Sequence, residues 1–133
     1  MATLFSKIAA GEIPSYKIAE NEEFYAFLDI HPITKGHTLV IPKAETDYLF
    51  DIEDDVLGRM MVFTKKIAKA LKKAIPCARV GVMVVGLEVP HAHIHLIPFE
   101  KESDLPSPKP KLKLEPDEMK GIAEKVQQNF NNK

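Results

Sequence analysis

The sequence lacks several features that whole classes of protein require. Its 133 residues contain one cysteine, Cys77, and no tryptophan. A single cysteine excludes an internal disulfide and offers no Cys-x-x-Cys pair to zinc, which is typical of a reducing compartment. No apolar run approaches the length of a membrane span, and residues 1–7 show no apolar core of a signal peptide. We therefore expect a cytoplasmic protein with no membrane partner.

An excess of charge of either sign is also missing, because 18 lysines and arginines stand against 19 acidic residues. A chain so balanced has no global attraction to nucleic acid, and any anionic substrate must be bound by local groups. The length suits one domain with a hydrophobic core and is too short for two. Nucleic acid is therefore not an expected partner.

Short strand patterns and one long helical pattern make up most of the chain. Residues 16–20, 24–29 and 37–42 are predicted as strands separated by turn residues. Residues 53–75 are predicted as a helix that Pro76 ends, because apolar side chains recur at helical spacing at Leu57, Met60, Met61, Thr64, Ile67, Ala68, Leu71 and Ile75. Residues 4–10 suit a short N-terminal helix, and a final amphipathic helix carries Met119, Ile122, Ala123, Val126 and Phe130.

The remaining strands are expected to form a hairpin. Residues 79–85 and 89–97 are predicted as strands joined by a tight turn at Gly86-Leu87. Together these elements predict an α+β fold with an antiparallel five-stranded meander sheet. We expect one domain over residues 1–100. Residues 101–133 would add an extended segment rich in proline and lysine, and then the C-terminal helix packed on the same domain.

Three of the five histidines stand at alternate positions of an apolar run, at His91, His93 and His95. A period of two is typical of a strand, and it would place the three rings on one face and the intervening apolar residues against the core. Imidazoles titrate near neutral pH, so a row of them on a rigid strand indicates chemistry rather than packing. Pro90 has no N–H to donate, and the strand ladder is therefore expected to be broken just before His91.

A metal site is the competing interpretation of this run, because His-x-His is a known zinc-ligand spacing. Strand residues two apart lie about 7 Å from each other at Cα, and the outer pair about 13 Å. Two of the three histidines can therefore share one ion, whereas all three can hardly do so. A further ligand would have to come from elsewhere, and the sequence shows no obvious cluster of carboxylates or cysteines to supply it.

The segment His91-Ala92-His93-Ile94-His95-Leu96-Ile97 resembles the His-φ-His-φ-His-φ-φ signature of the histidine-triad (HIT) family of nucleotide hydrolases and transferases. The resemblance implies a HIT-like fold and a hydrolase acting at the α-phosphate of nucleotide conjugates. His93, as the middle histidine, would be the nucleophile that forms a nucleotidyl-histidine intermediate. His91 would orient His93. His95 would donate a proton to a phosphate oxygen or to the leaving atom.

Other segments agree with this resemblance. Residues 36–42 resemble the family's Gly-His-x-Leu-Val-Ile-Pro strand, which would place His37 near the triad as a second proton donor. Residues 4–8 correspond to an N-terminal segment whose apolar side chains, here Phe5 and Ile8, line the nucleobase pocket. The implied partners are a purine nucleotide such as AMP or GMP and a second copy of the chain in a homodimer.

The segment Phe27-Leu28-Asp29-Ile30 resembles the family's Phe-x-Asp-Ile element. By that match Phe27 belongs to the nucleotide site, Asp29 binds the ribose hydroxyls and Ile30 packs on the sugar. An ionised carboxylate accepts two hydrogen bonds and suits a vicinal diol. The alternative is an aspartate that forms a turn before His31-Pro32.

Several positions depart from the family pattern. Many members bind a structural zinc through a Cys-x-x-Cys, a histidine and the first triad histidine, but Thr3, Ser6 and Glu45 stand at the first three positions here. Three lost ligands imply that the chain has no zinc there. Glu88 replaces a serine or threonine on the phosphate side, where a carboxylate repels a polyphosphate and welcomes a cationic amine. We therefore expect phosphoramidates to be preferred over dinucleoside polyphosphates.

The leading interpretation is thus a nucleotidyl hydrolase that needs no metal or other cofactor. An active-site asparagine of the family has no counterpart in this chain, because the loop before the triad is shorter. This loss and the altered Glu88 position leave a second possibility, a catalytically weak nucleotide-binding or protein-interaction module. A third is a metal-binding protein that uses two of the triad histidines and His37.

Overall fold

The computed structural model describes residues 3–86, 89–105 and 112–131, and a single five-stranded sheet organises them. The strands are β1 (Lys17–Glu20), β2 (Phe24–Leu28), β3 (Thr38–Pro42), β4 (Arg79–Met83) and β5 (Ile94–Phe99). All neighbouring strands are antiparallel. The helices are α1 (Leu4–Ala9), α2 (Asp54–Ala74) and α3 (Pro116–Asn131), with single 3-10 turns at η1 (Leu49–Asp51) and η2 (Glu102–Asp104). The predicted α+β class is confirmed.

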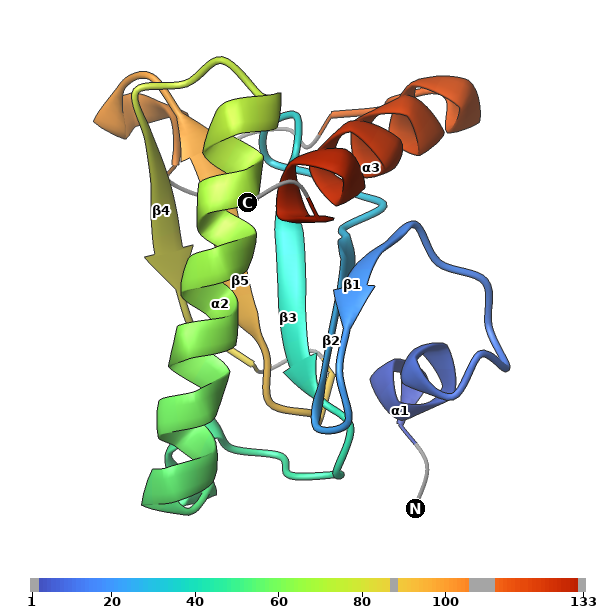
Figure 1. The fold of residues 1–133 in the computed structure, drawn as a ribbon, viewed down its shortest axis with the longest axis vertical. Coiled ribbons are helices and arrows are strands. Elements are labelled where there is room, and N and C mark those ends of the chain that lie inside the picture. Colours follow the sequence, from blue (N-terminus) through green and yellow to red (C-terminus); the bar gives the residue numbers. More distant parts are fainter. Residues whose placement is uncertain (1–2, 87–88, 106–111, 132–133) are drawn as a thin grey trace.

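The strand order β1-β2-β3-β5-β4 is a meander only in its first half. The expectation of a meander across all five strands is wrong for β4 and β5. The chain crosses over the sheet through α2 after β3, and β4 therefore runs parallel to β3 (Figure 1). In an all-antiparallel sheet β4 cannot lie beside β3, so β5 returns between them and pairs with both.

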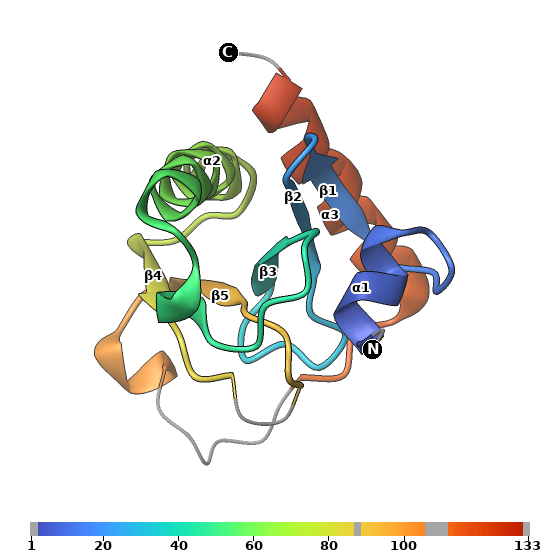
Figure 2. The same cartoon turned by 90° about the horizontal axis from the view of Figure 1, so that it is seen from below.

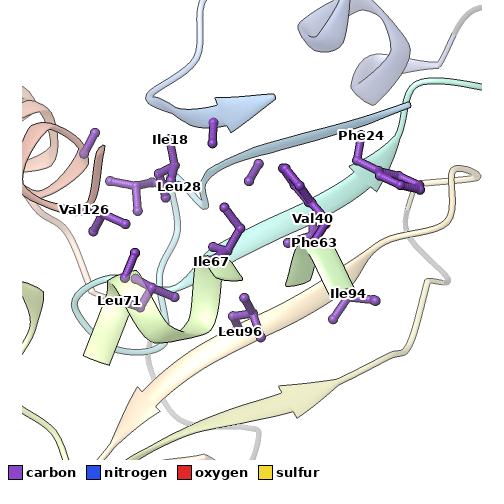
Figure 3. Close-up of a cluster of buried hydrophobic side chains, with 14 of the residues drawn as sticks. Ile18, Phe24, Leu28, Val40, Phe63, Ile67, Leu71, Ile94, Leu96 and Val126 are labelled. Atoms are coloured by element: carbon purple, nitrogen blue, oxygen red, sulfur yellow. The ribbon is translucent and has the colours of Figure 1, made fainter. Parts of the chain in front are cut away.

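The sheet separates two hydrophobic clusters, and alternate residues of β2 belong to different ones. Phe24, Ala26 and Leu28 join the larger cluster beneath α2 and α3, whereas Tyr25 and Phe27 join a smaller one beneath α1. Figure 2 accordingly shows α2 and α1 on opposite sides of the sheet. The larger cluster is drawn in Figure 3, where side chains from the strands, α2 and α3 meet.

The long helix α2 begins and ends within one residue of the predicted range 53–75. Asp54 and Asp55 occupy its first turn and Lys72 and Lys73 its last, which is the arrangement that the helix dipole favours. One residue of the predicted apolar stripe was placed wrongly, because Met61 is 44 % exposed while its neighbour Met60 is fully buried. Consecutive helical residues point about 100° apart, so the sheet covers only one of the two.

The predicted hairpin differs more from the structure. β4 ends at Met83 and β5 begins at Ile94, so the two strands are further apart along the chain than the prediction places them. The predicted turn at Gly86-Leu87 falls partly outside the described residues. His91 and His93 precede β5, and only His95 lies in the strand. The predicted break before His91 is confirmed, because the Ala92 N–H bonds to the Thr46 carbonyl at 2.6 Å and not to a neighbouring strand.

The C-terminal helix α3 packs on α2 and β1 through Met119, Ile122, Ala123 and Val126, as its apolar spacing predicts. The chain before it is tied to the loop between β2 and β3, since the Leu112 N–H donates to the Pro32 carbonyl at 2.8 Å. The predicted proline and lysine segment at residues 106–111 lies outside the described residues, and the division of the chain at residue 100 stays a prediction. Within the described part of the chain, no helix combines the length and apolar character needed to cross a bilayer.

Adjacent methionines of α2 offer a matched test of this packing. Met60→Ala removes a fully buried side chain and should lower the free energy of unfolding by about 2–5 kcal/mol. Met61→Ala, at an exposed position, should change it by no more than about 0.5 kcal/mol. Urea unfolding of both variants measures the difference. Equal losses in the two variants would contradict the placement of α2 on the sheet.

A candidate active site of four histidines

Two of the site's histidines are positioned by strand pairing. His95 lies on β5 opposite Leu39 of β3, and His37 immediately precedes β3. Their rings therefore lie side by side, with centroids 5.1 Å apart. The His93 ring lies on the other side of His95, at 4.9 Å between centroids. His31 lies in the exposed loop after β2.

The tautomer of His37 follows from its neighbour in the β2–β3 loop. The Ile33 N–H donates to Nδ1 of His37 at 3.0 Å, so Nδ1 carries no proton and the ring's proton lies on Nε2. Nε2 of His37 is 2.9 Å from Nδ1 of His95, to which it therefore donates. His95 in turn carries its proton on Nε2.

His91 is fully buried and is held at both nitrogens. Its Nε2 donates to the Pro42 carbonyl at 2.7 Å, which leaves Nδ1 as an acceptor. The Thr3 hydroxyl lies 2.7 Å from that Nδ1 and donates to it. Burial lowers the pKa of His91 below its usual value of 6.5 and outweighs the Pro42 carbonyl and Glu45, which raise the pKa. His93 lowers it further, so the ring is held neutral.

His93 has the opposite tautomer to its neighbours. Its Nδ1 donates to the backbone carbonyl of His91 at 2.7 Å, so Nε2 keeps an unprotonated lone pair. The Phe5 ring of α1 packs edge-on against His93 at 5.0 Å between centroids, and the side chain is 7 % exposed. A lone pair on His93 next to an N–H on His95 is a nucleophile beside a hydrogen-bond donor. This arrangement suits displacement at an electrophilic phosphorus.

The predicted ribose ligand Asp29 lies beside this row at the end of β2. Its Oδ1 accepts the His31 N–H at 2.8 Å, which is the turn-forming role that the sequence left open. Its Oδ2 lies 3.7 Å from Nε2 of His37, so the carboxylate is close to the histidines. The neighbouring Ile30 is 63 % exposed. The turn uses one oxygen of Asp29, and binding of the ribose by this residue stays a prediction.

Phe5, Ile8 and Phe27 are all buried in the smaller hydrophobic cluster between α1 and the sheet. Phe5 contacts Phe27 at 5.6 Å between ring centroids and also reaches His93. The cluster therefore lies directly against the histidines. The predicted role of these side chains in base binding stays a prediction, and Glu88 lies outside the described residues.

The positions that bind zinc in many members of the family do come together here, but their side chains do not fit the ion. Thr3 Oγ1 accepts the Ser6 N–H at 3.0 Å and contacts Nδ1 of His91, the atom that would otherwise face a metal. Hydroxyls of threonine and serine replace the thiolates that zinc prefers. Hydrogen bonds hold these groups together instead.

A second possible ligand group consists of Asp29, His37 and His95, whose donor atoms lie within 4.8 Å of one another. Coordination through Nε2 of His37 would require its proton to move to Nδ1. That nitrogen faces the Ile33 N–H, and two donors would then oppose each other. The hydrogen-bond pattern therefore argues against a metal on His37, which the third interpretation of the sequence needs.

Two features of the site are missing from the residue-based predictions. Thr3 was identified only as the replacement of a zinc ligand, although Thr3 and Ser6 stand at the spacing of a capping box that starts α1. The backbone N–H of Ile33 could not be predicted from the sequence, because any residue but proline supplies one.

Gly86 has a φ of +75°, and a Cβ there would lie 4.0 Å from the His93 ring.

Comparison with known proteins gives a consistent result. A family model described as "HIT domain" matches residues 10–102. An uncharacterized HIT-like protein of Borreliella burgdorferi is 37% identical over 135 residues, which cover 96% of this chain and 97% of that protein. The adenosine 5'-monophosphoramidase hnt1 of Schizosaccharomyces pombe is 33% identical, with 95% and 96% covered.

Solved structures agree with the relatives. A Hit-like protein involved in cell-cycle regulation from Bartonella henselae superposes with a TM-score of 0.82 at 31% identity, covering 96% of this chain and 95% of that one. A zinc-bound histidine triad family protein from Mycobacterium smegmatis has a TM-score of 0.80 at 27% identity, with 98% and 94% covered. The fold is therefore shared with a protein that does bind zinc.

The buried, neutral His91 predicts a specific dependence of stability on pH. The unfolded chain takes up a proton on this ring near pH 6.5 while the folded chain does not, so acid favours unfolding. Stability should therefore fall as the pH is lowered through about 6.5. Urea unfolding between pH 5 and 7.5 should show a smaller fall for His91→Gln. The exposed variant His31→Gln should behave like the wild type, and an unchanged slope in His91→Gln would refute the assignment.

Proposed function

The chain belongs to the HIT domain family, and we propose that it hydrolyses nucleoside phosphoramidates, in which a nucleotide such as AMP is joined to an amine through its α-phosphate. Several of its curated relatives are named adenosine 5'-monophosphoramidases. The observation that carries the proposal is the opposite protonation of neighbouring rings. His93 offers a lone pair on Nε2, and His95 offers an N–H.

The proposed reaction has two displacements at phosphorus. Nε2 of His93 attacks the α-phosphorus, the P–N bond breaks and the electron pair leaves with the amine nitrogen. That nitrogen takes up a proton through the hydrogen bond from Nε2–H of His95, with solvent resupplying it. Water then attacks the nucleotidyl-histidine and releases AMP and free His93. The sum is phosphoramidate plus water giving amine plus AMP.

The remaining residues are proposed to keep His93 and His95 in the required state. His91 accepts the Nδ1–H of His93 through its carbonyl, so His93 attacks with the other nitrogen. His37 donates to Nδ1 of His95, so the proton of His95 stays on the nitrogen that faces the ligand. General acid assistance of this kind contributes about 10² to 10⁴ in rate.

The nucleoside is proposed to lie along the edge formed by α1 and the end of β2. Asp29 is partly exposed, and its carboxyl group suits the ribose diol. The exposed side chain of Ile30 is free to cover the sugar. Phe5, Ile8 and Phe27 supply an apolar cluster beside the histidines for a purine base.

Turnover of an AMP-lysine phosphoramidate tests the proposal directly. The wild type should cleave it, and His93→Ala should lower kcat by at least about a thousandfold, because the nucleophile is lost. His31→Ala is the matched control, since His31 is an exposed histidine outside the row, and its kcat should be unchanged. AMP binding by calorimetry should persist in all three proteins.

Binding of AMP by the wild type without turnover would overturn the enzymatic proposal. It would favour the second candidate, a nucleotide-binding module, which the missing family asparagine motivates.

The same assay tests the proposed effect of Glu88 on substrate choice. Faster cleavage of a dinucleoside polyphosphate than of the phosphoramidate would show that a carboxylate at this position does not favour amine leaving groups.

We also propose that two copies of the chain associate through β4. This strand is at the edge of the sheet, and the apolar residues Val82, Val84 and Val85 on and after it are between 39 % and 56 % exposed. Exposed apolar edge strands pair readily with another strand, and a second copy would continue the sheet. The partly exposed Met61 and Val62 of α2 extend the apolar surface.

A charge at the centre of this edge should separate the two copies. Val82→Glu is expected to sediment as a monomer where the wild type sediments as a dimer, because pairing would bury the carboxylate. Leu4→Glu places the same charge on an exposed apolar residue of α1, far from β4, and should remain a dimer (Figure 1). A dimeric Val82→Glu would show that another surface joins the copies.

A further inference from the structure

The Thr3 hydroxyl makes a partly buried contact with the site that the proposed reaction does not use. It precedes α1 and lies 2.7 Å from Nδ1 of His91, which is 88 positions further along the chain. The same oxygen accepts the Ser6 N–H at 3.0 Å. Because the Ser6 N–H approaches the oxygen's lone pairs, the hydroxyl's one hydrogen is directed at His91.

This hydroxyl completes the hydrogen bonding of a ring that has no access to water. His91 is 0 % exposed, and Pro42 already occupies its Nε2. Without a donor at Thr3, Nδ1 would be a buried acceptor with no partner, and the ring would have to turn or admit water. The backbone carbonyl of the same residue accepts from His93, so a shift of His91 as a whole to regain a partner would displace the acceptor of His93.

We propose that Thr3 is a positioning residue for the nucleophile. Its hydroxyl holds His91 as the Nε2–H tautomer, and the His91 carbonyl then holds His93 with its proton on Nδ1 and its lone pair on Nε2. The N-terminal helix thereby acts on the chemistry through a hydrogen bond as well as through the ring of Phe5. The proposal rests on the proposed function for its kinetic consequence, whereas the hydrogen bond itself can be observed without turnover.

The chain offers a matched pair of substitutions at the start of α1. Thr3→Val keeps the shape of the side chain and removes the hydroxyl, and with it both the helix cap and the bond to His91. Ser6→Ala removes the other half of the capping box, in which Ser6 Oγ accepts the Thr3 N–H at 2.8 Å, and leaves the Thr3 hydroxyl in place. Neither change reaches the larger core, which contains no residue of α1.

The expected results separate positioning from helix stability. Thr3→Val should lower kcat for the AMP-lysine phosphoramidate on the order of tenfold, because Nδ1 of the buried His91 loses its hydrogen-bond donor. KM should change less than about twofold. Thr3→Ser keeps the hydroxyl and should restore most of the rate. Ser6→Ala should leave kcat within about twofold of the wild type, although both Ser6→Ala and Thr3→Val weaken the cap.

Ring nitrogen chemical shifts give a second readout that needs no activity. Long-range ¹H–¹⁵N spectra of the wild type should show His91 protonated at Nε2 and His93 at Nδ1. The His91 Nδ1 resonance should move in Thr3→Val and stay in Ser6→Ala. Unchanged spectra in Thr3→Val, or equal loss of kcat in Ser6→Ala, would overturn the proposal. A wild type that shows the expected spectra but no turnover would instead refute the proposed function alone.

Discussion

In each buried neutral imidazole of this protein, the N–H needs a hydrogen-bond acceptor and the other ring nitrogen needs a donor. This requirement determines how the site is built. Backbone groups meet most of it: the Pro42 carbonyl for His91, the His91 carbonyl for His93 and the Ile33 N–H for His37. In the part of the chain that the structure describes, no buried side-chain nitrogen or oxygen lacks a partner. Because backbone groups cannot exchange donor for acceptor, the tautomers are fixed along with the positions.

The irregular start of β5 is what makes this possible. In a regular ladder the His91 carbonyl would point to a neighbouring strand and bond there. Pro90 cannot donate to such a ladder, and the strand begins only at Ile94. The His91 carbonyl is therefore available to the side chain of His93, two residues on. A local defect in the sheet thus supplies the acceptor that orients His93, while the regular pairing of β5 with β3 positions His95.

The sequence predicts most of the fold because periodicity is a local property. The helical spacing of residues 53–75 identifies an element and its buried face without reference to the rest of the chain, whereas the alternate spacing of the histidines predicts a strand from residue 89 that begins only at Ile94. Met61 shows the limit of this local information. Whether an apolar residue at the margin of a helical stripe is buried depends on which other elements cover it. The order of β4 and β5 in the sheet likewise depends on where the crossover through α2 returns to the sheet, which is not a local property of the sequence.

The site's hydrogen bonds escape prediction for a related reason. Thr3 and His91 are brought together by the folded sheet, and nothing at either position specifies the partner. The Ile33 N–H is a backbone group and carries no sequence signal at all. Motif resemblance finds the residues that react, but the groups that fix their protonation are found only in three dimensions.

The start of α1 is joined to His91 by the Thr3 hydroxyl, at a position where many family members have a zinc ligand. A zinc ion would bind the imidazole of His91 through a lone pair and would be released by chelators or by acid. The Thr3 hydroxyl donates to a lone pair of this ring and needs no ion, and burial, helped by His93, lowers the pKa of His91. Because Thr3, Phe5 and Ile8 all belong to the first turns of the chain, the same short helix covers the apolar cluster and orders the histidines.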